Sequence, residues 1–224
     1  MSSAMGENKT IAIMQPYFFP YPGYFELIES VDLFVVLEDV QFPRRGWVHR
    51  NRFRNKTSLE VEWWGLPLKK GPQASTMISD LVFDLSRETH FRESANRLLF
   101  NSHSASINSH FPNLFELSSF SVVEYLVENL ENTKRYLSIT TPYLMSSEIP
   151  NEKKLTGGSR LIQICKELGA SSYINAPGGK ELYDSMEFLR EGINLQFMKD
   201  FKGNNLSILD QLFEKDFDFL KKSF

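Results

Sequence analysis

Residues 10–39 read TIAIMQPYFFPYPGYFELIESVDLFVVLED, and this stretch decides the fold class. Thr10–Met14 is an apolar run of strand length, and it stops at a Gln-Pro pair because proline ends regular pairing. Apolar residues then recur at helical spacing across Tyr21–Val31, with Pro22 near the start, where its missing N–H costs nothing. Leu33–Leu37 is a second apolar run. A strand, a helix and a strand within about 30 residues predict a βαβ unit.

The middle of the chain has a different pattern. Residues Trp47–Phe83 are strand-like, with clear alternation at Ser58–Trp63, and predict a β-rich excursion. Helical spacing at Ser86–Phe100 and Ser121–Leu137 predicts a helical insertion, with Asn101–Asn108 as a loop inside it. We place this insertion at residues 86–137.

The α/β rhythm returns in the last third of the chain. Gly169 suits a helix C-cap. We expect strands near Tyr143, at Ser172–Asn175 and at Asn194–Met198, and helices at Ser159–Leu168, Gly179–Arg190 and Gln211–Phe224. The sequence therefore predicts one α/β domain over residues 1–224, built on a Rossmann-like parallel sheet.

Composition excludes several classes of protein. Hydrophobic residues make up 42% and charged residues 24% of the 224, which is typical of a globular protein. Twenty-five basic and 28 acidic residues leave no positive field for nucleic acid. The N-terminus is polar and no apolar run reaches about 18 residues, so we expect no secretion signal and no membrane insertion. The single Cys165 predicts a buried thiol in a reducing compartment, the cytoplasm.

Three blocks of the sequence resemble the WbqC-like family, which is usually met among genes for bacterial surface-polysaccharide sugars. The blocks are Met14–Ile28 with Glu38–Gln41, Gly46–Phe53, and Arg160–Tyr183. Within the second block the family pattern has asparagine where this chain has His49. The stretch Phe91–Phe120 departs from the family pattern.

The opening also resembles nucleotidylyltransferase-type α/β domains, which place a His-x-Gly-His element at the helix start. In that slot this chain has Tyr21-Pro22-Gly23-Tyr24, so the glycine is kept and both histidines are replaced. A tyrosine offers one hydroxyl of high pKa and cannot replace histidine at a transferring phosphate. We expect the nucleotidylyltransferase-type fold without its usual chemistry.

Ligands of open α/β sheets gather beyond the C-terminal ends of the strands. We therefore expect one cleft formed by the residues that follow three strands, namely Gln15, Tyr17, Asp39, Gln41, Asn175, Gly178 and Gly179. Tyr21, Gly23 and Tyr24 would bind an anionic or sugar ligand at the helix start. The phenylalanines of the same aromatic stretch are more often core than platform.

The second block supplies further candidates. Arg50 beside Trp47 suits a phosphate or carboxylate next to a ring, although the same residues equally describe a solvated face. Lys69 is a further candidate phosphate binder, and paired lysines such as this are usually solvated. Substituting Arg50 or Asn51 by alanine should abolish ligand binding with little loss of stability, because we expect neither in the core.

The resemblance implies an N-acyl or aminoacyl transferase that acts on a nucleotide-linked amino sugar. Its donor would be a thioester on coenzyme A or on an acyl carrier protein. Asp39 or His49 would be the base, and Asn51 or backbone N–H groups would hold the oxyanion. Asp39 equally suits a turn cap or an ion pair with Arg44 or Arg50.

Two alternatives remain open. The first is a non-catalytic protein that binds a nucleotide or sugar, and the second is a divergent nucleotidylyltransferase that requires Mg²⁺ and a nucleoside triphosphate. We expect no protein-bound metal, because the four histidines form no His-Glu-x-x-His element.

Overall fold

The computed structural model describes residues 8–55, 57–69, 75–99 and 111–214. The chain divides into two compact units, each assembled from three segments. The sheet unit comprises Met1–Gln15, Glu26–Glu38 and Thr141–Lys202, and the hairpin unit comprises Pro16–Phe25, Asp39–Thr140 and Gly203–Phe224. One domain over residues 1–224 stays a prediction.

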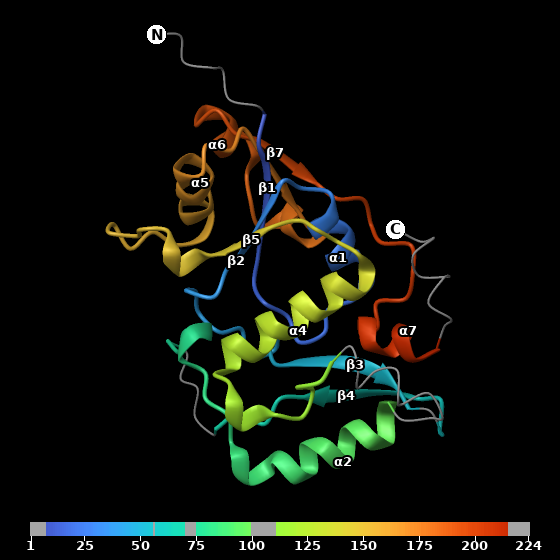
Figure 1. The fold of residues 1–224 in the computed structure, drawn as a ribbon. Helices are drawn as coiled ribbons and strands as arrows, with labels where there is room; N and C mark the ends of the chain where they lie inside the picture. Colours follow the sequence, from blue (N-terminus) through green and yellow to red (C-terminus); the bar gives the residue numbers. More distant parts are fainter. Residues whose placement is uncertain (1–7, 56, 70–74, 100–110, 215–224) are drawn as a thin grey trace. The chain divides into compact units, whose positions relative to one another are not determined.

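The sheet unit contains five parallel strands in the order β5-β2-β1-β6-β7 (Figure 1). The strands are β1 (Thr10–Met14), β2 (Leu33–Val36), β5 (Tyr143–Met145), β6 (Ser172–Asn175) and β7 (Asn194–Phe197). Numbered by their order in the chain, they lie as 3-2-1-4-5. This is the order of a doubly wound sheet, whose direction of winding reverses between β1 and β6. The prediction of an α/β fold with a parallel sheet is confirmed.

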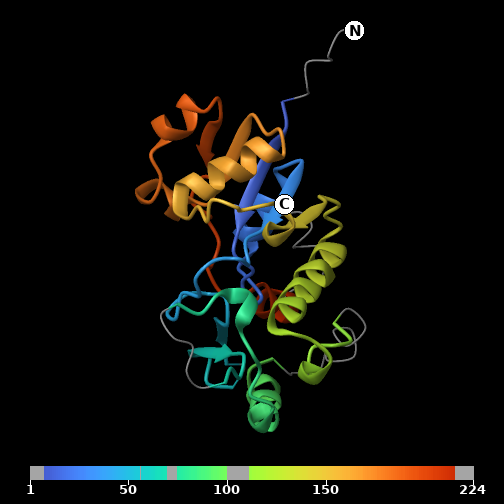
Figure 2. The same ribbon diagram turned by 90° about the vertical axis from the view of Figure 1, so that its left-hand side faces the viewer.

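Alternating side chains of the strands build the core of this unit. Ile11, Ile13 and Val35 share one buried cluster with Leu161 and Phe188, because residues two apart on a strand point to the same face. Leu161 belongs to α5 (Gly157–Glu167) and Phe188 to α6 (Ser185–Arg190). Figure 2 shows α5 lying against the strands.

Cys165 lies in the same cluster and is fully buried. Burial raises the pKa of its thiol to about 12. The thiol is therefore protonated at neutral pH and packs as a small hydrophobe, as predicted.

Most predicted elements of this unit are confirmed, but the prediction of one helix was wrong. α1 (Pro22–Glu29) begins at the predicted proline, and Gly169 follows α5 with φ of +65°. The helix predicted at Gly179–Arg190 is instead a 3₁₀ turn, η5 (Pro177–Glu181), followed by α6. The break occurs because the Asp184 side chain accepts from the Met186 N–H at 2.9 Å and starts a new helix. The remaining 3₁₀ turn of the unit is η4 (Ser146–Glu148).

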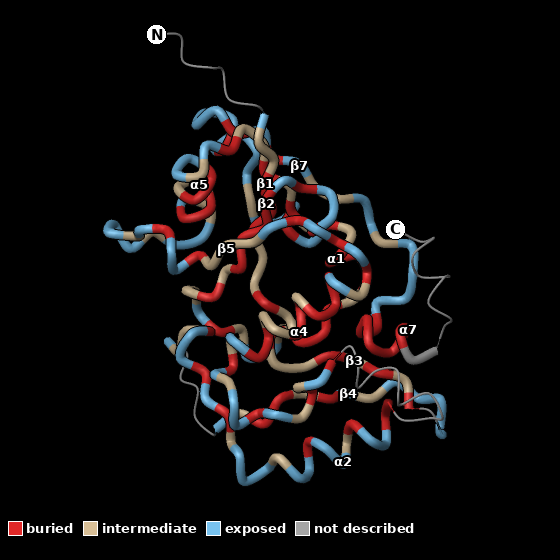
Figure 3. The backbone as a smooth tube through the Cα atoms, viewed as in Figure 1, coloured by how far each residue is buried: buried red, intermediate tan, exposed pale blue. Residues whose placement is uncertain are grey.

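Among its described residues, the hairpin unit contains an antiparallel pair of strands and three helices. The strands are β3 (Arg50–Arg54) and β4 (Val61–Gly65), and the helices are α2 (Glu88–Leu99), α4 (Val122–Leu137) and α7 (Ile208–Glu214). The 3₁₀ turns are η1 (Ile78–Asp80), η2 (Leu85–Arg87) and η3 (Leu117–Ser119). Buried residues recur every three to four positions along α2, with mostly exposed residues between them (Figure 3), as expected of an amphipathic helix.

The predicted helices of the insertion are confirmed, with Ser121 as the N-cap of α4. The β-rich excursion is smaller than predicted, and its second strand begins at Val61 because the residues before it form the turn of the hairpin. The terminal helix begins at Ile208 and not at Gln211, and its predicted end, residues 215–224, lies outside the described residues. The predicted loop Asn101–Asn108 lies outside them as well. Across the part of the chain that the structure describes, no helix combines the length and apolar character needed to cross a membrane.

Candidate functional site

The winding reversal of the sheet unit places two predicted residues at the same edge of the sheet. Gln15 follows β1 and Asn175 ends β6, and these strands are hydrogen-bonded neighbours. The crevice outside the strand ends at such a reversal is where open α/β sheets bind their ligands. Of the residues predicted to share one cleft, the sheet unit therefore holds Gln15, Asn175, Gly178 and Gly179, while the others belong to the hairpin unit.

The turn after β6 is held by Asn175, which is 5% exposed. Its Oδ1 accepts from the Ala176 N–H at 2.7 Å, and the Gly179 N–H donates to the Ala176 carbonyl at 3.0 Å. A Cβ at position 179 would lie 2.5 Å from Asn175 Nδ2, whereas one at Gly178 would meet nothing within 4 Å. Glycine is thus required at 179 for close packing. Gly178 is exposed, as are Lys180 and Glu181 of the same turn.

An acidic residue that the sequence reasoning missed closes the end of β2. Glu38 is 3% exposed and accepts from Ser146 Oγ at 2.6 Å, from the Ser146 N–H at 3.1 Å and from the Ser147 N–H at 3.1 Å. Its carboxylate therefore caps η4 and joins β2 to the residues after β5. No sequence signal distinguished it from the neighbouring Asp39.

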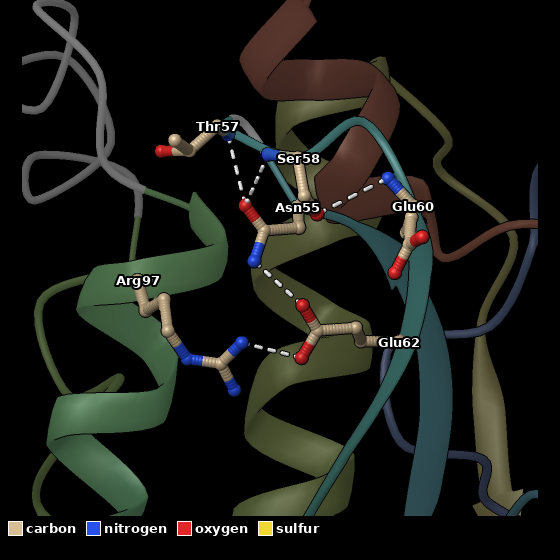
Figure 4. Close-up of polar contacts among 6 residues, drawn as sticks. All are labelled: Asn55, Thr57, Ser58, Glu60, Glu62 and Arg97. Atoms are coloured by element: carbon tan, nitrogen blue, oxygen red, sulfur yellow. Dashed lines mark hydrogen bonds and ion pairs between the residues drawn. The ribbon is translucent and has the colours of Figure 1, made fainter.

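The β3–β4 hairpin owes its geometry to the turn shown in Figure 4. Asn55 Oδ1 accepts from the Thr57 N–H at 2.8 Å and from the Ser58 N–H at 3.1 Å, and Asn55 Nδ2 donates to Glu62 at 2.6 Å. Arg97 of α2 pairs with the second oxygen of Glu62. These bonds lower the pKa of Glu62, Arg97 contributing most. The ion pair between Arg97 and Glu62 joins α2 to one face of the hairpin. The opposite face carries different residues.

That second face carries two arginines and two tryptophans. Arg50 and Arg52 lie two residues apart on β3, and Arg52 is paired across the strands with Trp63. The Trp63 and Trp47 rings stack with centroids 5.4 Å apart. Arg50 Cζ lies 4.4 Å from the Trp63 centroid, and Arg52 Cζ lies 5.3 Å from the Trp47 centroid. Each guanidinium is thus held over an aromatic ring. We call these four residues the Arg-Trp face.

Three buried nitrogen atoms at this place have no hydrogen-bond partner among the described residues. They are Nδ1 of His49, Nε of Arg50 and Nε of Arg52. One terminal nitrogen of each arginine does donate to a carbonyl, that of Arg45 or of Asn205, at 3.3 Å. Among the residues described, neither arginine pairs with a carboxylate. Arg50 and Trp47 were predicted, whereas Arg52 and Trp63 complete the set only through strand pairing.

Asn51 does not have the environment that we expected. It is 2% exposed, and its Nδ2 donates to the carbonyls of Phe18 at 3.2 Å and Phe19 at 2.7 Å. Its Oδ1 accepts from the Arg52 N–H at 2.8 Å. The expectation that Asn51 lies outside the core was wrong, because strand alternation turns it toward the buried aromatic loop. Both of its donors are used, so it positions that loop.

His49 is partly buried and packs edge-on against Phe42, with ring centroids 5.1 Å apart. Burial, and secondarily the charge of Arg50, lower the pKa of His49 from 6.5 to about 4. The imidazole is therefore neutral at neutral pH.

The aromatic loop places its predicted residues differently from one another. Tyr24 is 1% exposed, and burial raises its pKa well above the ordinary value. Its ring centroid lies 5.4 Å from that of Tyr17. Tyr17 and Tyr21 are only partly buried, while Gly23 is buried. Tyr24 thus packs in the core, and Tyr17 and Tyr21 are the tyrosines of the loop that retain exposed surface.

Three further predicted residues lie on connecting segments of the hairpin unit. Asp39 is partly buried, and Gln41 is exposed and forms an isolated bridge with Met77. Lys69 is exposed, and its N–H donates to the Val82 carbonyl at 2.9 Å. Nothing in their geometry distinguishes them as ligand-binding groups.

Comparison with known proteins identifies the family. A profile described as the WbqC-like protein family matches residues 15–220. The chain belongs to this family. It is also 30% identical over 189 residues to a protein of Mycobacterium tuberculosis (strain ATCC 25618 / H37Rv) named Uncharacterized protein Rv1507c, and the match covers 80% of this chain and 78% of that protein. No solved structure gives a significant match.

Two pockets of this WbqC-like protein lie away from most of the predicted residues. In the sheet unit, α5 and α6 line a pocket of about 870 Å³ that includes Lys166 and Glu191, and none of the predicted residues lines it. In the hairpin unit, Trp63 borders a pocket of about 180 Å³ together with Arg87 and His90. Trp63 therefore belongs both to the lining of the second pocket and to the Arg-Trp face.

Proposed function

We propose that this protein is an enzyme of polysaccharide biosynthesis that transfers an acyl or aminoacyl group to a nucleotide-linked amino sugar. Membership of the WbqC-like family supports the polysaccharide role. The observation that supports nucleotide binding is the winding reversal of the sheet, where Gln15 and Asn175 lie at the ends of neighbouring strands. The strand order also supports a nucleotidylyltransferase-type core as the inherited scaffold.

In the proposed reaction, the amine nitrogen of the sugar attacks the carbonyl carbon of a thioester on coenzyme A or on an acyl carrier protein. A C–N bond forms and the C–S bond breaks. The proton that the amine loses passes to a base and then to the thiolate that leaves, so the products are an amide and a thiol.

The proposal assigns the base to Asp39 or His49. At its pKa of about 4, His49 is unprotonated at neutral pH, as a base must be. This value lies far below the neutral optimum of a general base, so His49 would be a weak base, and the proposal leaves the choice between Asp39 and His49 open. The Nδ2 group of Asn51 already donates to two carbonyls. The proposal therefore assigns stabilisation of the oxyanion to backbone N–H groups.

The test incubates the full chain with UDP-linked amino sugars and acetyl-coenzyme A, or with an acyl carrier protein thioester. Free thiol and the mass of the amide product are measured together, and we expect them in equal amounts. Gln15→Ala should raise KM for the sugar nucleotide about tenfold, the worth of one hydrogen bond. Gln196→Ala, an exposed glutamine on β7, is the matched control and should leave KM unchanged.

Other outcomes would replace the proposal. Binding of the sugar nucleotide without thiol release from any thioester would support a non-catalytic sugar- or nucleotide-binding protein. Release of pyrophosphate from a nucleoside triphosphate with Mg²⁺ would support a divergent nucleotidylyltransferase.

A further inference from the structure

The Arg-Trp face of the hairpin unit has the chemistry of an anion-binding site. Arg50 and Arg52 each carry a buried Nε–H with no acceptor among the described residues. Buried N–H groups of folded proteins are almost always bonded to protein, water or a ligand, so two such donors on one strand face require an explanation. No carboxylate pairs with either arginine in the described part of the chain.

The neighbouring rings hold both guanidinium groups in place before any ligand arrives. Arg50 lies over Trp63 and Arg52 over Trp47, and the two rings stack on each other. Each arginine also anchors one terminal nitrogen on a backbone carbonyl. A long side chain normally loses rotamer freedom on binding, and this cost is reduced where the side chain is already fixed.

Glycine at position 65 permits this arrangement. A Cβ there would lie 2.7 Å from the His49 carbonyl oxygen and 2.8 Å from Arg50 Cβ. Because Gly65 is the cross-strand partner of Arg50, any larger residue would push Arg50 away from its position. The sequence of β4 is thus suited to holding Arg50 close to the hairpin.

The number of donors selects the class of anion. A carboxylate has two oxygens, and the fork of one guanidinium satisfies them. Two guanidinium groups on one face offer more donors than a carboxylate can accept, and they match the several oxygens of a phosphate or diphosphate. We propose that the Arg-Trp face is a binding site for the phosphate or diphosphate group of a substrate, with the guanidinium groups of Arg50 and Arg52 as its donors.

The site itself does not depend on the proposed reaction, whereas the source of the phosphate rests on it. In that reaction two substrates carry such a group. One is the nucleotide-linked sugar with its diphosphate, and the other is the thioester donor with the phosphates of coenzyme A or of a phosphopantetheine arm.

The experiment measures binding of inorganic pyrophosphate to the full chain by calorimetry at low ionic strength, where charge interactions are least screened. Arg50→Lys and Arg52→Lys keep the charge and remove the Nε–H and the planar fork. We expect each to weaken pyrophosphate binding about tenfold to a hundredfold, the worth of a hydrogen bond to a charged group. The matched control is Arg92→Lys, since Arg92 is paired with Glu88 at 3.0 Å, and it should bind as the wild type does.

Melting temperatures of all three variants establish that they fold. Absence of pyrophosphate binding to the wild type, or equal binding by folded lysine variants, would overturn the proposal, the second because charge alone would then suffice. Displacement of pyrophosphate by UDP assigns the site to the nucleotide sugar, and displacement by coenzyme A assigns it to the thioester donor. If neither displaces it, the face is no substrate site. A failed acyl-transfer assay leaves these binding results unaffected, so the two proposals fail separately.

Discussion

At the scale of single residues, His49 couples stability to pH. Its pKa is about 4 in the folded chain and 6.5 in the unfolded chain, because burial disfavours the charged imidazole. Between these values the unfolded chain binds a proton that the folded chain does not, so stability falls as pH falls from about 6.5 to about 4.

His49→Asn replaces the imidazole by a side chain that does not titrate, so it should remove this loss of stability at acid pH. Urea unfolding at pH 7 and pH 4.5 gives the two free energies, and the wild type should lose more between them than the variant. His90→Asn changes an exposed histidine of α2, and this variant should lose as much unfolding free energy between pH 7 and pH 4.5 as the wild type does. An equal loss in wild type and His49→Asn would contradict the coupling.

Asn51 acts at the same scale through packing. Asn51→Ala leaves two carbonyls of the aromatic loop, those of Phe18 and Phe19, without their donor. Since stranded buried polar groups cost about 1–3 kcal/mol each, unfolding should become about 3 kcal/mol easier. Asn96→Ala on the exposed side of α2 should change stability by less than about 0.5 kcal/mol. Chemical denaturation measures both, and equal values would show that the Asn51 bonds contribute nothing special.

At the scale of elements, two adjacent glycines of η5 form a matched pair. Gly179→Ala places a Cβ 2.5 Å from Asn175 Nδ2 and must displace that side chain, whereas Gly178→Ala meets open space. We expect Gly179→Ala to cost about 1–3 kcal/mol, as overpacking usually does. It should also weaken UDP binding, because Asn175 lies at the winding reversal. Gly178→Ala should be close to neutral in both thermal unfolding and calorimetry. A neutral Gly179→Ala would mean that Asn175 has room to move.

At the scale of the whole molecule, each unit is assembled from three segments of the chain. Residues 39–140 supply most of the hairpin unit but lack two of its parts. Phe18 contacts the Phe53 and Trp64 rings, and Asp210 accepts from the Arg54 N–H at 2.7 Å. A fragment of residues 39–140 would therefore expose the aromatic core and lose a cap of β3.

We expect this fragment to be unfolded in isolation while the full chain folds. One-dimensional NMR and circular dichroism compare the two, and dispersed amide and methyl signals from the fragment would refute the expectation. The physical reason is that its core is completed only by residues distant in sequence, so the fragment cannot bury enough apolar surface to offset its conformational entropy.

The sequence by itself determined the family and the parallel α/β plan. Apolar runs of strand length and helical spacing are local signals, so β1 and β6 have the bounds predicted and α1 begins at Pro22. The helix expected at Gly179–Arg190 failed because a side-chain cap at Asp184 outweighed a continuous pattern.

For the candidate site, local chemistry identified Gln15, Trp47 and Arg50 as residues of interest. Only the tertiary structure decided that Asn51 is a core residue and that Arg52 and Trp63 join Arg50, because these facts depend on which residues face each other across β3 and β4. Pairing between strands is a non-local property. The type of a residue determines which hydrogen bonds and contacts its side chain can make. The partner strand determines which of them are already made within the folded protein.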